Sequence, residues 1–132
     1  MVDGFEPLID EGTGPSVSPS KAKTTLAVAR NNYFIVPGGE LSESGIIEHQ
    51  AQSVSALAGY NQLASNANSA VAPVGIIGEV KHFECLRRPH VGERVETTVQ
   101  MGMTFGNVTL AKCESTVDGE TIAWINLKVF MQ

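Results

Sequence analysis

Glu48 and His49 are neighbouring residues whose side chains could take part in proton transfer. A carboxylate and an imidazole are groups that enzymes often use as general acids and bases. Both residues lie in a segment with helical periodicity, in which successive side chains point about 100° apart around the axis. The two groups therefore do not face each other. We expect His49 to be packed inside the protein or at an interface, although it could enter a site from across a dimer interface.

The other chemically active side chains are dispersed along the sequence. His82 lies in a strand-like segment, where we expect a structural role, and His90 lies at a Pro-Gly corner, where we expect exposure. Cys85 and Cys113 lack metal-ligand spacing and are typical of small, buried, reduced thiols. The sequence has no Gly-x-Ser-x-Gly motif, which excludes a serine hydrolase built on that turn.

The segment that carries Glu48 is predicted to be a helix over about residues 42–63, with Ser42 or Ser44 as its cap. One helical stripe is apolar and consists of Ile47, Ala51, Val54 and Ala58. The neighbouring stripe consists of Glu48, Gln52, Ser55 and Gly59. Because these residues are polar or small, this side of the helix could approach another backbone closely.

Strands are predicted on both sides of the helix. Residues 24–29 predict a short strand, and residues 12–20 and 64–73 have the composition of loops. After residue 74 the pattern is that of strands, with strict alternation over residues 95–105 and hairpin turns at Gly106-Asn107 and Asp118-Gly119. In the last strand, residues 121–131, one face carries Ala123, Ile125, Leu127 and Val129, and the other carries Trp124 and Phe130.

We expect one face of this last strand to cover the helix and the other to meet a partner. The order of elements is a short strand, a long helix and a long antiparallel meander. There is no alternation of strands and helices, which excludes a doubly wound parallel sheet.

Length and charge limit the class of protein. The chain has 132 residues and a formal net charge of −5. Nucleic-acid binding needs a clear excess of Lys and Arg, so this class is disfavoured. The first residues lack the basic start and apolar run of a signal peptide, and no stretch approaches the roughly 20 apolar residues that span a bilayer. We therefore expect a cytoplasmic domain without membrane contact.

Two segments resemble one known family. Residues 45–53 read GIIEHQAQS, which is similar to the LIIEAMAQ helix of bacterial β-hydroxyacyl-[acyl-carrier-protein] dehydratases. Phe83 and residues 87–95, RRPHVGERV, resemble the F-R-K-P-V-V-P-G-D-Q-L segment of that family with small deletions, and residues 7–10 loosely match its opening. The resemblance implies an α+β hotdog fold, a long central helix wrapped by a curved antiparallel sheet, as a single domain over residues 1–132.

The resemblance also implies which residues form the site. Glu48 matches the carboxylate that serves the leaving hydroxyl group, whereas the family's base is a histidine on the loop before the helix. The corresponding residues 31–39 contain no histidine, and gapless counting places Phe34 at its position. Gly38 and Gly39 could offer backbone N–H groups to the thioester carbonyl. Phe34, Gly38, Gly39 and Gln52 are therefore candidate substrate-binding residues beside catalytic candidates Glu48 and His49.

The implied partners are an acyl thioester on acyl carrier protein or coenzyme A, in fatty-acid or polyketide-type synthesis, and a related hotdog subunit in a homodimer or heterodimer. Lys81, Arg87 and Arg88 could attract an acidic carrier protein, or could be solvated strand-end residues. The reaction needs no cofactor or metal. Two alternatives stay open: a thioesterase in which Glu48 activates water or attacks the carbonyl, and a non-catalytic acyl-binding subunit.

Overall fold

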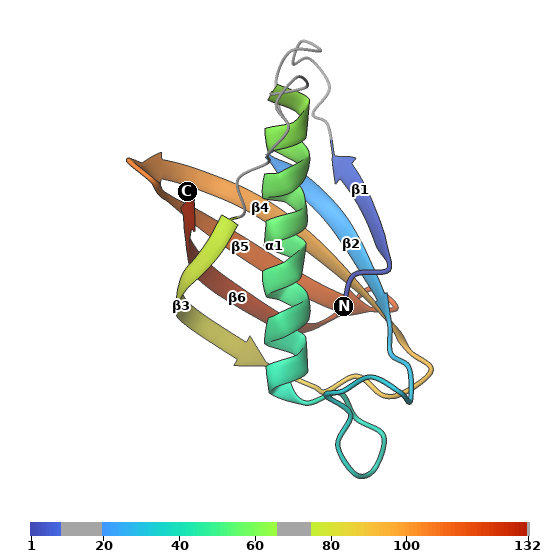
Figure 1. Ribbon diagram of the computed structural model, residues 1–132. Helices are drawn as coiled ribbons and strands as arrows, with labels where there is room; N and C mark the ends of the chain where they lie inside the picture. The colour runs from blue at the N-terminus through green and yellow to red at the C-terminus, as the bar shows by residue number, and fades with distance from the viewer. Residues whose placement is uncertain (9–19, 66–74, 132) are drawn as a thin grey trace.

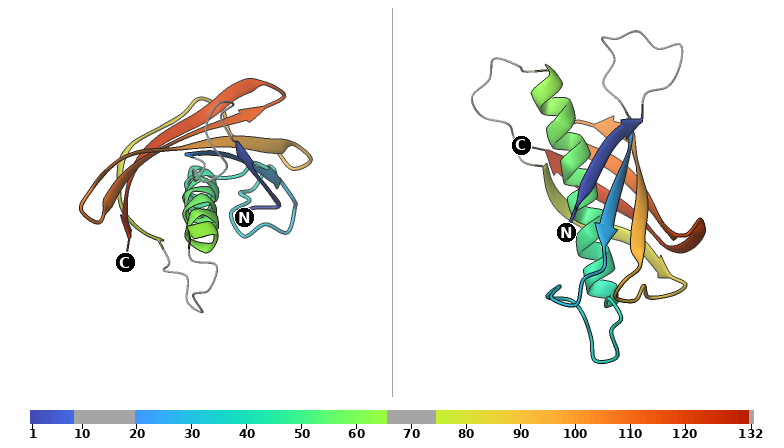
Figure 2. Two further views of the ribbon diagram at one scale, coloured as in Figure 1. Left: turned by 90° about the horizontal axis from the view of Figure 1, so that it is seen from above. Right: turned by 90° about the vertical axis from the view of Figure 1, so that its right-hand side faces the viewer.

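The computed structural model describes residues 1–8, 20–65 and 75–131 (Figure 1). Its elements are β1 (Gly4–Leu8), β2 (Lys21–Ala27), α1 (Glu43–Ser65), β3 (Gly75–Cys85), β4 (Arg94–Phe105), β5 (Val108–Val117) and β6 (Glu120–Met131). The strands form one six-stranded sheet in the order β1-β2-β4-β5-β6-β3, and every neighbouring pair is antiparallel. The sheet curves around α1, as the end-on view in Figure 2 shows. This arrangement confirms the predicted α+β hotdog fold.

The start of α1 shows why the helix begins where it does. The Gly45 N–H donates to Ser42 Oγ at 3.2 Å, so Ser42 is the N-cap, one of the two predicted candidates. A Cβ added at Gly45 would lie 2.6 Å from Phe34 Cβ and 2.7 Å from Leu41 Cδ1. Glycine at this position therefore allows the preceding loop to pack closely against the first turn.

The side of α1 that packs on the sheet differs from the predicted apolar stripe. Val54 and Ala58 are buried, but Ile47 and Ala51 are only half-buried. The side chains that α1 buries most completely are Ile46, His49, Gln50, Ser53, Val54 and Leu57. With about 100° per residue, this buried side is rotated by roughly 90° from the centre of the predicted stripe. Hydropathy alone indicates the wrong side because half of the buried set is polar.

The strand β1 was not predicted by periodicity. Pro7 lies within it, and proline is tolerated in a strand at the edge of a sheet, where the missing N–H is not needed for pairing. Gly4 meets Thr25 across the pair, in register with β2. The loops predicted at residues 12–20 and 64–73 lie mostly outside the described residues, although residues 64 and 65 continue the helix.

The meander follows the sequence pattern until a bulge in β4. Val95, Thr97 and Val99 are buried, whereas Met103 and Phe105 are exposed. An irregularity between Met101 and Thr104 adds one residue to β4, which changes the side to which the following residues point. Simple alternation could not predict this change of face.

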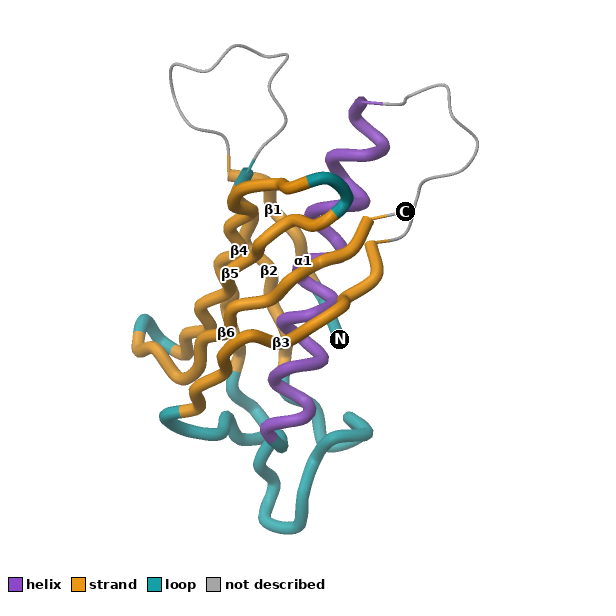
Figure 3. Tube along the Cα trace, turned by 90° about the vertical axis from the view of Figure 1, so that its left-hand side faces the viewer, coloured by secondary structure: helices purple, strands orange, loops and turns teal. Residues whose placement is uncertain are grey.

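The hairpin turns and the last strand agree better with the sequence. The two predicted turns connect β4 to β5 and β5 to β6, with positive φ at Gly106, Asp118 and Gly119. Of the two faces of β6, the one buried in the core carries Ala123, Ile125, Leu127 and Val129. The edge strand β3 lies beside β6, and no strand of the described residues lies on its other side (Figure 3). In the described residues, no helix is long and apolar enough to cross a membrane.

Candidate functional site

Glu48 lies on the side of α1 that points away from the protein's own sheet. Successive helical residues differ by about 100°, so Glu48 is roughly opposite the middle of the buried side. Its carboxylate is half-buried, and Oε1 accepts a hydrogen bond of 2.7 Å from Gln52 Nε2 one turn later. A Cβ added at Gly59, on the same side, would meet no described atom within 4 Å. The predicted stripe of polar and small residues is therefore the open side of the helix.

The loop before α1 contains the predicted carbonyl-binding glycines. Gly38 and Gly39 have φ values of 106° and 87°, which other residues rarely adopt. The Gly39 N–H donates to Val36 O at 3.0 Å, so this donor is already used within the turn. Phe34 is half-buried and lies against the start of α1, with its N–H donating to Asn32 Oδ1 at 2.9 Å.

This loop pairs with the Pro-Gly corner, a contact that the sequence did not predict. The Leu41 N–H donates to Pro89 O, and the Val91 N–H donates to Gly39 O, both at 2.8 Å. Between them, His90 forms a bridge with Glu40, and His90 Nε2 lies 3.7 Å from Glu40 Oε2. An exposed imidazole thus lies beside the loop that lacks a histidine. Nothing in the local pattern links these two segments, because about fifty residues separate them.

His49 is buried, with both ring nitrogens engaged. Nδ1 lies 2.7 Å from Met1 O, and Nε2 lies 2.9 Å from Thr97 Oγ1. Thr97 Oγ1 is 2.6 Å from Ser115 Oγ, which accepts from Gln50 Nε2 at 3.1 Å. A separate contact joins α1 to β2, since Ser53 Oγ is 2.7 Å from Thr24 Oγ1. Several polar side chains therefore connect the helix to the sheet inside the core.

The Met1 carbonyl determines the tautomer of His49. A carbonyl oxygen only accepts hydrogen bonds, so Nδ1 carries a proton, and in the neutral ring Nε2 then accepts from the Thr97 hydroxyl. The remaining bonds then run in one direction, from Gln50 through Ser115 and Thr97 to His49. Burial lowers the pKa of His49, and the Met1 carbonyl opposes this effect only in part. His49 is thus a neutral core residue, and it lies on a different side of α1 from Glu48.

The predicted basic cluster is divided by local ion pairs. Lys81 Nζ lies 3.6 Å from Glu79 Oε1 on β3. Arg87 forms a two-pronged pair with Glu93, at 2.9 and 3.1 Å, which lowers the pKa of the Glu93 carboxyl group. Arg88 has no ion pair among the described residues. The positive charge of Arg88 is therefore less compensated than those of Lys81 and Arg87.

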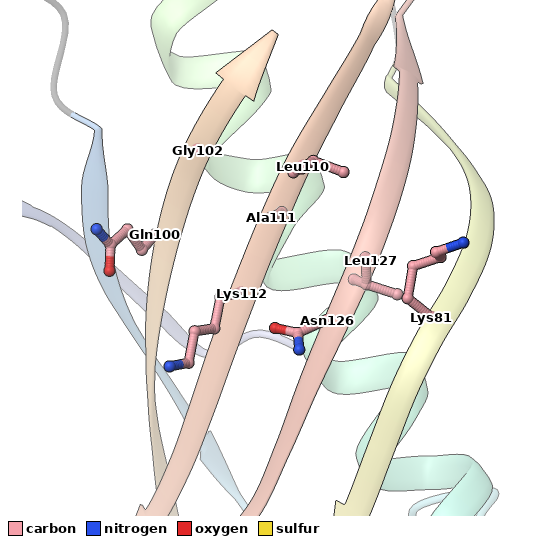
Figure 4. Close-up of a pocket in the computed structure, with 8 residues that line it drawn as sticks. All are labelled: Lys81, Gln100, Gly102, Leu110, Ala111, Lys112, Asn126 and Leu127. Atoms are coloured by element: carbon pink, nitrogen blue, oxygen red, sulfur yellow. The ribbon is translucent and has the colours of Figure 1, made fainter.

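A hollow of about 440 Å³ lies on the outer face of the sheet, and Figure 4 shows its lining. It is bordered by Lys81, Gln100, Gly102, Leu110, Ala111, Lys112, Asn126 and Leu127. The helix covers the opposite face of these strands, so this hollow is separate from Glu48. Among the described residues, no three His, Cys, Asp or Glu side chains come together as a metal site. Cys85 is half-buried and Cys113 is buried, and both are free thiols.

Solved structures with the same fold define the class of protein. The chain is similar to the ApeI:P dehydratase heterocomplex of Xenorhabdus doucetiae, with a TM-score of 0.73, 15% identity, and coverage of 85% of this chain and 75% of that one. It is also similar to a hypothetical thioesterase with coenzyme A from Streptococcus pneumoniae TIGR4, with a TM-score of 0.72, 8% identity, and coverage of 98% and 90%. Together with the single helix and curved sheet, these similarities define a hotdog protein.

The sequence itself places the chain more narrowly. Residues 8–132 match the model of the ApeP-like family, described as ApeP dehydratase, so the chain belongs to the ApeP-like dehydratase family. Comparison with curated protein sequences gives no match. The family assignment agrees with the dehydratase resemblance of the helix and corner segments.

Proposed function

We propose that this protein is a β-hydroxyacyl-thioester dehydratase subunit in which Glu48 serves the leaving hydroxyl group. The orientation of Glu48 carries this proposal, because its carboxylate lies on the open side of α1 and a neighbouring carboxamide holds it. A substrate that reaches Glu48 must lie outside this chain's own core, between α1 and another subunit. Membership of the ApeP-like dehydratase family supports the reaction class.

The proposed reaction has two proton transfers. A base removes the proton next to the thioester carbonyl while hydrogen-bond donors stabilise the negative charge that develops on the carbonyl oxygen. A carbon–carbon double bond then forms as the carbon–oxygen bond to the β-hydroxyl group breaks. Glu48 donates a proton to that oxygen, and water leaves. The products are an α,β-unsaturated thioester and water.

The base is proposed to come from a partner hotdog subunit. Residues 31–39 contain no histidine, and His49 uses both ring nitrogens inside the core. The similarity to the ApeI:P dehydratase heterocomplex favours a heterodimer. The long edge strand β3 has no neighbouring strand on one side among the described residues, which is a suitable place for a second sheet to continue the first. We also propose one hotdog domain over residues 1–132, because the described residues form one helix and one sheet.

The substrate is proposed to be carried by acyl carrier protein or coenzyme A. The hypothetical thioesterase of Streptococcus pneumoniae was solved with coenzyme A, which supports a carrier of this kind. The pathway in which the thioester arises would be fatty-acid or polyketide-type synthesis.

The test compares this protein alone with a mixture that contains a hotdog dehydratase subunit bearing the loop histidine. We expect slow formation of unsaturated thioester alone and faster formation in the mixture. In the mixture, Glu48→Gln should lower kcat by roughly 10²- to 10⁴-fold. The matched control is Glu43→Gln, an exposed carboxylate in the first turn of α1, which should leave kcat unchanged.

Other outcomes identify the alternatives. Rapid dehydration by the protein alone that survives replacement of each histidine in turn would contradict the composite site. Release of free acid from the thioester, abolished by Glu48→Gln, would instead identify a thioesterase. Binding of acyl thioester without turnover of any kind would identify a non-catalytic acyl-binding subunit.

A further inference from the structure

The rotation of α1 about its own axis does not follow its hydropathy. The apolar stripe that contains Ile47 and Ala51 would be the natural contact with an apolar sheet. Instead, α1 is rotated by roughly 90° from that position, given about 100° per residue. His49, Gln50 and Ser53 are fully buried as a result. Ile46, Val54 and Leu57 are buried on the same side, but the three polar side chains need hydrogen-bond partners in the core as well.

Polar groups of β4 and β5 provide hydrogen-bond partners for two of these buried side chains, His49 and Gln50. Thr97 and Ser115 are opposite each other across this strand pair, and both are fully buried. Their hydroxyl groups connect His49 to Gln50 in the directional series described above, with contacts of 2.6 to 3.1 Å. His49 and Gln50 of α1 are thus both hydrogen-bonded to the Thr97–Ser115 pair of the sheet.

Any other rotation of α1 would break the hydrogen bonds from this pair to His49 and Gln50, although Thr97 and Ser115 would still contact each other. A buried donor or acceptor that loses its partner is strongly unfavourable, whereas the same groups exposed to water are not. If the two hydroxyl groups were removed, His49 Nε2 and Gln50 Nε2 would lose their partners in the core, and we expect α1 to turn its apolar stripe towards the sheet against the remaining Ser53–Thr24 contact. Ala51 would then turn towards the sheet, and Ala56, on the other flank, would turn towards solvent. Both residues are half-buried at present.

We infer that Thr97 and Ser115 are positioning residues, which set the rotation of α1 and thereby the direction in which Glu48 points. The effect of these residues on the rotation of α1 is independent of function, whereas their effect on catalysis rests on the proposed role of Glu48. The network keeps Glu48 opposite the sheet, where it can reach a substrate between subunits. The apolar stripe alone would place Glu48 at the side of the helix, nearer the protein's own sheet.

The first experiment measures the rotation without any assay of activity. Cysteine probes are placed singly at Ala51 and Ala56, in a Cys85→Ser background that retains the buried Cys113. Thr97→Val, which preserves the shape but removes the hydroxyl group, should slow thiol labelling at position 51 and accelerate it at position 56. Thr97→Ser, which keeps the hydroxyl group, and Thr98→Val, on the outer face of β4, should change neither rate.

Changes of opposite sign distinguish rotation from general loosening. If Thr97→Val accelerates labelling at both positions, or changes neither, the inference is overturned. Ser115→Ala provides a milder version of the test if Thr97→Val fails to fold, and it should change the two rates in the same directions.

The second experiment tests whether the rotation of α1 controls activity, by using compensating substitutions to restore both. Thr97→Val with Ser115→Ala should lower kcat by roughly 100-fold, the scale of a misplaced catalytic group. Adding His49→Leu and Gln50→Met makes the sheet-facing side apolar again, so it should restore both the labelling pattern and kcat. Failure of this rescue in a variant with the restored labelling pattern would overturn the positioning role. Rotation in a protein whose activity is unaffected by Glu48→Gln would contradict the proposed function and leave the inference on rotation supported.

Discussion

Gln52 Nε2 donates a hydrogen bond of 2.7 Å to Glu48 Oε1 across one turn of α1. The contact joins two residues of the candidate site, Glu48 as the catalytic candidate and Gln52 as a substrate-binding candidate. It holds one carboxylate oxygen, Oε1, and the structure shows no hydrogen bond to the other among the described residues. Gln52 thereby restricts the rotamers of Glu48.

Replacing Gln52 by Leu should therefore reduce catalysis without abolishing it. The bond is exposed, and a hydrogen bond of this kind contributes about 0.5–1.5 kcal/mol, which corresponds to roughly a twofold to tenfold fall in kcat. Steady-state kinetics with a β-hydroxyacyl thioester measures the effect. Gln100→Leu, an exposed carboxamide on the outer face of the sheet, is the matched control. An equal effect of both changes would argue against a role for the Glu48–Gln52 contact.

The burial of His49 should make the stability of the protein depend on pH. Burial lowers the pKa of His49 from its ordinary value of 6.5, so the unfolded chain binds a proton more readily than the folded one. The free energy of unfolding should thus fall as pH decreases below about 6.5, by up to about 1.4 kcal/mol per pH unit. Denaturant titrations at several pH values measure the slope. It should weaken in His49→Leu and persist in His90→Asn, whose imidazole is exposed.

Gly45→Ala should destabilise the start of α1. The added methyl group would lie within 2.7 Å of atoms of Phe34 and Leu41, so the loop or the helix must shift. Overpacking of this kind costs about 1–3 kcal/mol, more than the alanine gains from its higher helix propensity. Thermal or urea unfolding measures the change. Gly59→Ala is the control, since a Cβ there meets no described atom within 4 Å, and it should be neutral or stabilising.

Arg88 should contribute more than Arg87 to any attraction for an acidic carrier protein. Glu93 already compensates Arg87, whereas Arg88 has no ion pair in the described part of the chain. Arg88→Glu should raise KM for a carrier-bound substrate, more strongly at low salt, and leave KM for a coenzyme A thioester unchanged. Arg94→Glu, an exposed cation at the start of β4, is the control. A rise in KM for both kinds of substrate would indicate an effect on the acyl site instead.

Predictions of where elements begin, end and turn were accurate. The span of α1, a cap at Ser42 or Ser44, and both hairpin turns follow from local periodicity and turn chemistry, and the structure has them with Ser42 as the cap. The departures have specific physical causes. Pro7 conceals an edge strand, and one extra residue in β4 moves Met103 and Phe105 to the outer face.

The sequence by itself thus determined the elements of this protein other than β1, its hotdog class and the candidate carboxylate at Glu48. Only the tertiary structure decided how that carboxylate is directed. Thr97 and Ser115 come from strands far along the chain, and they draw a polar side of α1 into the core against its apolar pattern. The pairing of His90 with Glu40 is decided in the same way. Such contacts depend on partners that local periodicity does not contain.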